Sequence, residues 1–276
     1  MLPLQLRRPT LERPLPSREF QPLLLERLTA LRDTLGDREP AVVCNWHGIR
    51  GLRWACAREE PATALLHAEE AMVIAQAIGH GKYCTLLSSI ASMNRWLIGA
   101  AEAAERTLVD MRDDDVGMVS SFRPFVLAWL LADRGALGDA RGWAERLVAS
   151  GQAKRLPQDE GRGRWALAEV LRRAGELGAA DAEAQAALAM LSATCPIEVP
   201  GALATLAAVR LAQGRAAEGA ALAEEGLARY PLIELIGPAV PRRDVSHEKG
   251  VFAVMGTVRH NGFCWSVIRR PHCMNA

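Results

Sequence analysis

The sequence predicts an all-α fold, a right-handed α-solenoid of helix hairpins with an irregular C-terminal tail. Three observations predict it. Alanine and leucine supply much of the hydrophobic half of the composition while aromatic residues make up only 5%, a bias that favours helices over strands. Apolar residues recur at helical spacing along most of the chain. Finally, residues 161–191 and 200–230 repeat the same order of helix, glycine turn and alanine-rich helix, which is typical of a helical repeat array.

The turns set the period of the array. Glu60-Pro61 separates the helices of the first pair, and Gly99, Gly135, Gly175 and Gly214 separate those of the next four pairs, at spacings of 36 to 40 residues. A helix commonly ends in a left-handed residue, a conformation that glycine adopts at the least cost. We therefore expect five helix pairs, with four tryptophans filling the gaps between neighbouring pairs. These are Trp96, Trp129, Trp143 and Trp165.

Three regions follow from this pattern. Residues 1–17 are rich in proline and arginine, and we expect a disordered N-terminal segment. Residues 18–230 form the repeat domain, which starts with a leading helix over 18–35. Residues 231–276 lose the helical period and form an irregular tail, in which Asn261-Gly262 indicates a short hairpin. Two origins of the tail stay open: a replaced or frame-shifted end, or a genuine small appendage.

The expected helix pairs follow the turns along the chain. The helices are expected over 41–59 and 62–78, 83–98 and 100–111, 124–134 and 137–150, and then on either side of the turns at Gly175 and Gly214, ending at Tyr230.

Charge and cysteine content restrict the class of protein. The net charge is +1, from 33 basic and 32 acidic residues, so no nucleic-acid footprint is expected. The six cysteines show no Cys-x-x-Cys spacing, which fits free thiols in a reducing compartment better than disulfides. The first 20 residues contain four prolines and no continuous apolar run, so neither a signal peptide nor a membrane helix is expected. These features predict a cytoplasmic protein.

No motif for catalysis or nucleotide binding is expected to function. The sequence lacks the glycine-rich loop, His-Arg-Asp and Asp-Phe-Gly of a protein kinase. Gly79-His80-Gly81-Lys82-Tyr83 has some likeness to a phosphate-binding loop, but its first glycine is replaced by Gln76 and its Ser/Thr by Tyr83. We expect a turn between repeats there, no enzyme activity, no catalytic residue and no cofactor.

Other groups of reactive or charged residues have either a functional or an ordinary structural interpretation. Trp46 and Arg50 share a helix with Cys44 and His47, and the sequence places further basic and aromatic residues after them. Nucleic-acid stacking is one interpretation, but neighbouring glutamates make the local charge mixed. No orienting residue supports Cys44 and His47 as nucleophile and base. Several metal-ligand types match no standard spacing, so no metal site is expected. They are His247, His260, Cys264, His272, Cys273 and the acidic run Asp110, Asp113, Asp114 and Asp115.

The repeats resemble tetratricopeptide repeats of a longer variety. The segments RWALAEVLRRAGELGAADAEAQAAL (164–188) and LAAVRLAQGRAAEGAALAEEGLARY (206–230) are similar to the C-terminal repeats of large bacterial signalling proteins. Those proteins join a eukaryotic-like Ser/Thr kinase or a regulator domain to an ATPase module. The period here is looser than the 34-residue consensus, and its aromatic signature is missing.

The resemblance implies a protein-interaction, scaffolding or sensor module. Its partner would be a protein or peptide in a concave groove lined by the first helix of each unit, with neither nucleic acid nor membrane as partner. A ligand-sensing regulator is a second interpretation. A truncated fragment of a multi-domain kinase, AAA-type ATPase or transcriptional regulator is a third. The last repeat needs a covering neighbour, so self-association through an uncapped C-terminal repeat is also expected.

Overall fold

A computed structural model describes residues 17–52, 61–111 and 121–229 of the chain. Within these ranges the protein has eleven α-helices, two short 3-10 helices and no strand. The segments 1–16 and 230–276 lie outside the described residues. So does the turn expected at Glu60. The boundaries expected for the N-terminal segment and the tail therefore stay predictions.

The helices are close to those expected from the sequence. In chain order they are α1 (Ser17–Leu35), η1 (Gly36–Arg38), α2 (Pro40–Gly51), α4 (Pro61–Ala77), α5 (Gly81–Leu97), α6 (Ala101–Asp110), α7 (Phe122–Asp133), α8 (Leu137–Lys154), α9 (Pro157–Arg173), α10 (Leu177–Thr194), η3 (Pro196–Glu198), α11 (Val199–Ala212) and α12 (Ala216–Arg229).

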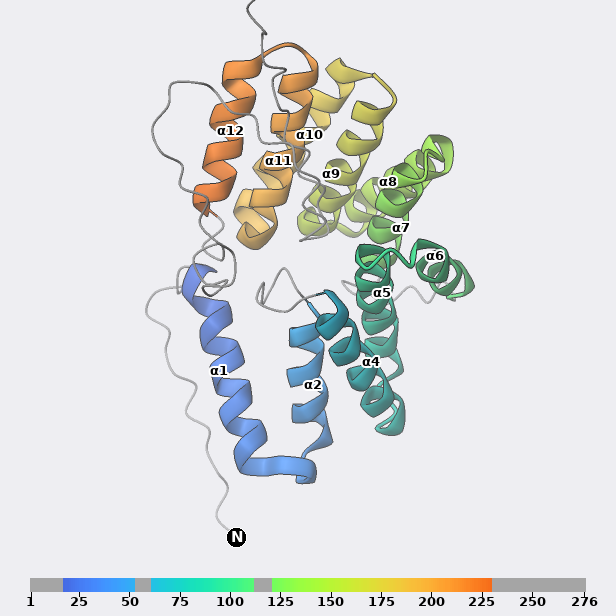
Figure 1. Cartoon of the computed structure of the whole chain (residues 1–276), viewed down its shortest axis with the longest axis vertical. Helices are drawn as coiled ribbons and strands as arrows, with labels where there is room; N and C mark the ends of the chain where they lie inside the picture. Colours follow the sequence, from blue (N-terminus) through green and yellow to red (C-terminus); the bar gives the residue numbers. More distant parts are fainter. Residues whose placement is uncertain (1–16, 53–60, 112–120, 230–276) are drawn as a thin grey trace, which may run out of the picture.

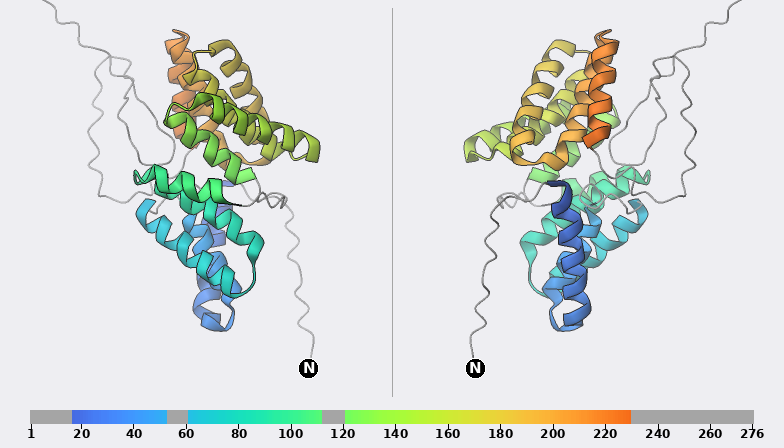
Figure 2. Two further views of the ribbon diagram at one scale, coloured as in Figure 1. Left: turned by 90° about the vertical axis from the view of Figure 1, so that its right-hand side faces the viewer. Right: turned by 90° about the vertical axis from the view of Figure 1, so that its left-hand side faces the viewer.

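Consecutive helices pack in pairs, and each pair stacks on the next. The pairs are α2 with α4, α5 with α6, α7 with α8, α9 with α10 and α11 with α12. Figure 1 shows α1 to α6 as one group and α7 to α12 as a second, joined where α5 and α6 contact α7. Two further views show the same division (Figure 2). This order of stacked hairpins is an α-solenoid, which confirms the predicted all-α fold class.

The first helix makes a contact that the repeat pattern alone does not predict. Helix α1 packs on α2, but it also contacts η3, which lies 160 or more residues later in the chain. The start of the array therefore returns towards its last helix pair, as Figure 1 shows where the upper end of α1 approaches α11 and α12.

The turn glycines adopt the conformation that the sequence analysis required. Gly99, Gly135, Gly175 and Gly214 have φ angles of 92°, 81°, 81° and 79°. Around Gly135, the backbone N–H of the next residue donates to the carbonyl of Leu131 at 2.9 Å, and the N–H of Gly135 donates to Ala132 at 3.1 Å. These bonds satisfy carbonyls that the end of α7 would otherwise leave unpaired.

Small residues on the second helices bring the backbones together. The fully buried alanines of α4, α8 and α10 recur at helical spacing along one face. They are Ala64, Ala68, Ala71, Ala75, Ala140, Ala144, Ala180 and Ala187. Larger side chains fill the spaces between pairs. Trp129 of α7 and Trp165 of α9 are buried and pack against each other, which confirms that these two fill the space between neighbouring pairs. Trp96 and Trp143 are partly buried against the same core.

One helix end carries a non-glycine residue in the left-handed region. Arg155, which follows α8, has φ 54° and ψ 44°. Because a β-carbon is strained there, we expect Arg155→Gly to raise the free energy of unfolding by about 1 kcal/mol. Urea titration followed by circular dichroism measures this change. Arg155→Ala removes the same side chain but keeps the β-carbon, and it should give no such gain; an equal gain from both variants would contradict the explanation.

Candidate binding surfaces

The residues of the phosphate-loop-like sequence form a helix-to-helix turn. Gly79 has φ 71°, and its N–H donates to the carbonyl of Gln76 at 3.1 Å, while the N–H of His80 donates to Ala75 at 2.7 Å. Tyr83 is half-buried, and a β-carbon on Gly48 would meet its hydroxyl. The backbone N–H groups of Gly79 and His80 are therefore already used to end α4.

Cys44 and His47 on α2 do not form a nucleophile and base. Cys44 is buried, and its Sγ donates to the carbonyl oxygen of Ala71 at 3.3 Å. Burial, with a smaller contribution from Cys84, raises the pKa of the Cys44 thiol and keeps it protonated. The His47 ring instead contacts His67 on α4, Nδ1 to Nδ1, at 2.9 Å. The sequence alone does not indicate this contact with His67, because nothing in the spacing of two residues on different helices shows that they meet.

Trp46, a candidate stacking surface for a nucleic-acid base, is already packed. Trp46 is 8% exposed, and its ring lies 4.0 Å from the guanidinium carbon of Arg32 and 4.7 Å from that of Arg50. Its Nε1–H donates to Thr29 at 3.0 Å. These contacts make Trp46 a link between α1 and α2. The neighbouring residues Arg53, Trp54 and Arg58 lie outside the described residues.

The first helices of the last three pairs offer little open surface for a groove. Ten of the twelve residues of α7 are buried, as are eleven residues of α9 and nine of α11. Trp165 of α9 joins these helices, since its ring centroid lies 5.2 Å from Phe125 and 5.7 Å from Trp129 of α7. Its Nε1–H donates to Thr205 of α11 at 2.9 Å.

A buried ionic cluster connects three helix pairs beside these aromatic rings. The Arg162 Nε donates to both carboxylate oxygens of Glu198, at 2.8 and 3.0 Å, and its Nη1 donates to Ser121 at 2.9 Å and to Asp159 at 3.4 Å. The guanidinium also lies 4.5 Å over the ring of Phe122. All the polar partners are satisfied within the fold, so the cluster is a structural link between α7, α9 and η3 and not an open site.

Cys195 borders this cluster, and its thiol is unreactive. Burial, reinforced by the carboxylate of Glu198, raises the pKa of its thiol to about 12. Its thiolate population near neutral pH is therefore negligible, and the thiol is not a nucleophile.

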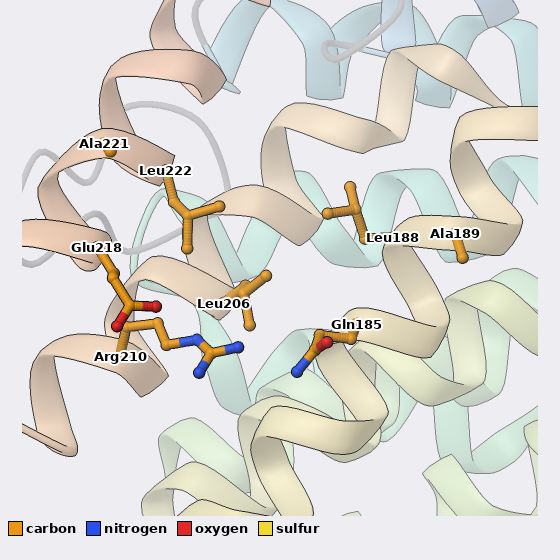
Figure 3. A pocket seen from close by; sticks show the side chains of 8 residues that line it. All are labelled: Gln185, Leu188, Ala189, Leu206, Arg210, Glu218, Ala221 and Leu222. Atoms are coloured by element: carbon orange, nitrogen blue, oxygen red, sulfur yellow. The ribbon is translucent and has the colours of Figure 1, made fainter. Parts of the chain in front are cut away.

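A shallow cleft of about 530 Å³ opens between α10, α11 and α12. Figure 3 shows the side chains of Leu188, Leu206 and Leu222, one from each helix, pointing into it. Gln185 and Arg210 face the same space from α10 and α11. The cleft exists because α12 packs mainly on α11 and leaves a gap to α10.

The charges at the rim of the cleft are already paired. The Arg210 Nε lies 2.9 Å from Asp181 of α10, and Glu218 of α12 accepts hydrogen bonds from Arg215 at 2.7 and 2.5 Å. The cleft therefore combines an apolar floor with a rim that attracts neither sign of charge strongly.

The described ranges contain no group of three or more His, Cys, Asp or Glu side chains placed to hold a metal ion. Most of the metal-ligand types noted in the sequence lie in 231–276 or 113–115, outside those ranges. In the same ranges, no helix is both long enough and apolar enough to cross a membrane.

Comparison with known proteins adds a structural likeness. No protein-family model and no curated protein match the chain. Among solved structures, the chain is similar to the crystal structure of the apo form of RapI, with 11% sequence identity and a TM-score of 0.42. The match covers 74% of this chain and 58% of RapI, so the chain spans little more than half of that protein's length. The fold assignment rests on the chain's own helices and their order.

Proposed function

We propose that this chain is a non-catalytic protein-interaction module that binds an apolar segment of a partner protein in the cleft between α10, α11 and α12. The cleft itself carries the proposal, because three leucines from three helices line an opening whose rim charges are already neutralised. Amphipathic helices bind such surfaces by inserting side chains spaced at i, i+3 or i+4.

The shape of the cleft favours a peptide segment over a small molecule. A small ligand usually buries 70–90% of its surface in its pocket, and this cleft is shallow and open to solvent. A groove lined by the first helices stays a prediction. Because α7, α9 and α11 are largely buried, the better candidate surface is the cleft, which α10 and α12 line together with Leu206 and Arg210 of α11.

The setting we propose is a bacterial signalling system, with the chain as a scaffolding or regulatory sensor module in the cytoplasm. Resemblance of residues 164–188 and 206–230 to kinase-associated repeats supports this setting. The free thiols of Cys44, Cys84 and Cys195 fit a reducing compartment. Neither nucleic acid nor membrane is proposed as a partner. Self-association is a further proposal, supported by the packing of α12 mainly on one neighbour.

The alternative function is that of a fragment of a multi-domain Ser/Thr kinase, ATPase or transcriptional regulator. The coding sequence on either side of the gene distinguishes the two, because a fragment requires adjacent reading frames for kinase or ATPase modules. Saturable ATP binding by the isolated chain in calorimetry would contradict the non-catalytic proposal.

Filling the cleft should abolish partner binding without unfolding the protein. Gln185 is exposed and points into the cleft, so Gln185→Trp should lower the affinity for peptides selected on the wild-type protein at least tenfold. Fluorescence anisotropy with labelled peptides measures this loss. The matched control is Gln152→Trp on α8. Both glutamines are exposed and donate to a carboxylate, Gln185 to Asp181 at 2.8 Å and Gln152 to Glu160 at 3.0 Å.

The two variants together decide the proposal. We expect both to keep the wild-type melting temperature and only Gln185→Trp to lose affinity. Equal affinities in the wild type and Gln185→Trp would place the binding surface elsewhere.

A further inference from the structure

Two histidines from different helices share a single short contact in the N-terminal half. His47 on α2 and His67 on α4 meet Nδ1 to Nδ1 at 2.9 Å, with ring centroids 5.0 Å apart. A neutral imidazole has one N–H and one bare nitrogen, and an imidazolium has two N–H groups. With at most one ring charged, the contact is a hydrogen bond in the tautomers that leave one Nδ1 bare and the other protonated. When both rings are charged, it becomes a clash of two donors.

The groups around the two histidines disfavour protonation of both rings at once. The Trp46 ring lies nearly perpendicular to both imidazole rings, at centroid distances of 4.8 and 5.4 Å. Arg32 of α1 and Arg50 of α2 lie over that same indole ring.

Each packed helix contributes its own electrostatic effect. Burial lowers the pKa of His47 below its ordinary value of 6.5. Of the charged neighbours, Glu70 of α4 acts to raise this pKa, whereas Arg50 and Arg32 act to lower it. On α5, burial raises the pKa of Tyr83 to about 12, so that residue stays neutral throughout the relevant range.

We propose that the His47–His67 pair is a pH-sensitive junction, which holds α2 against α4 near neutral pH and releases them when both rings become protonated. The release would extend to α1. Helix α1 is held to α2 through Trp46. The Nε1–H of this residue donates to Thr29 of α1, and the guanidinium of Arg32, also on α1, stacks over its ring. The proposal concerns regulation of the fold and does not depend on the peptide-binding cleft.

The direction of the pH effect follows from linkage. A base whose pKa is lower in the folded protein than in the open state takes up its proton more readily when the structure opens. The junction is therefore fully formed above about pH 7.5, and it weakens as the pH falls through 6.5 and below the lowered pKa of His47. The hydrophobic cluster of α2, α4 and the middle of α5 is separate from the larger cluster, which runs from Met93 of α5 and Leu108 of α6 to Val209 of α11, so opening should stay confined to the N-terminal half.

Hydrogen exchange of the full chain tests the junction. After correction for intrinsic exchange rates, the opening equilibrium of amides in α2 and α4 should rise about tenfold between pH 7.5 and 5.5, whereas amides in α9 and α10 should not change. His67→Gln keeps a hydrogen-bonding side chain that does not titrate and should remove the pH dependence. The control is His80→Gln, which replaces an exposed histidine at the start of α5 and should retain it.

A second measurement covers the case in which His67→Gln fails to fold. In the wild-type protein, NMR titration of the imidazole Cε1–H signals should show His47 and His67 titrating as a coupled pair, with one step below pH 6.5. Independent titration of both rings near pH 6.5 would overturn the proposal. So would a pH-dependent opening of α2 and α4 that persists in His67→Gln.

Discussion

Replacing Arg162 with methionine is expected to lower the free energy of unfolding by about 3–5 kcal/mol at neutral pH. Arg162 is 4% exposed, and its guanidinium satisfies Glu198 and Asp159, which are 7% and 4% exposed. Methionine preserves much of the volume but leaves two buried carboxylates without their cation. Burial already raises the pKa of Asp159, against the opposing effects of Ser121 and Arg162. Chemical unfolding followed by circular dichroism gives the size of the loss.

The loss should shrink as the solution is acidified. Without Arg162, the buried Asp159 carboxyl loses a cation that opposes the effect of burial, so its folded-state pKa lies still further above its ordinary value, and the folded variant binds more protons than the unfolded chain. Its stability relative to the wild type then falls as the pH rises and recovers as the pH falls towards 5. Adding Glu198→Gln to Arg162→Met should recover part of the loss at neutral pH, because it removes one buried charge.

An exposed arginine provides the control for Arg162. Arg141 also bonds a glutamate of the following pair, Glu176, at 2.9 Å, and another on its own helix, Glu145, but these side chains are solvated. Arg141→Met should leave the unfolding midpoint unchanged, since exposed ion pairs contribute little. If Arg162→Met were as mild as Arg141→Met, the buried ionic link between α7, α9 and η3 would not exist.

The repeat architecture could be predicted from sequence because its signals are local. The left-handed turns at Gly135 and Gly175 depend on one residue type that tolerates positive φ. The buried face of α10 depends on alanines spaced three and four residues apart, such as Ala180, Ala184 and Ala187. In both cases a residue and its near neighbours in the chain determine the local structure, so a single sequence suffices to predict it.

The contacts that connect distant pairs could not be predicted in the same way. Helix α9 is polar by composition, yet eleven of its residues are buried. Its Arg162 can be buried because Glu198, 36 residues later in the chain, pairs with it. Glycines of α9 also allow neighbouring helices to pack closely. His67 and the cleft between α10 and α12 have the same origin. Each depends on how far one pair rotates on the next, and no short sequence pattern encodes that rotation.

Gly151→Ala is expected to destabilise the protein by about 2–3 kcal/mol, because α8 and α9 cross with their backbones in contact. A β-carbon at Gly151 would lie 2.7 Å from the Cα of Glu160 and closer still to its amide nitrogen. The contact is reciprocal, since a β-carbon at Gly163 of α9 would lie 2.7 Å from the backbone nitrogen of Val148. Backbone atoms of two helices cannot rotate away as the end of a flexible side chain can, so the helices must move apart.

Gly142→Ala in the same helix should have the opposite effect. A β-carbon there would meet nothing within 4 Å, and alanine in a helix interior is more stable than glycine by roughly 0.5–1 kcal/mol. Urea unfolding of the two single variants therefore separates two effects within one helix. Gly142→Ala measures helix propensity, and Gly151→Ala measures the packing of α8 on α9. A gain in stability from both substitutions would show that α8 and α9 do not approach each other at Gly151.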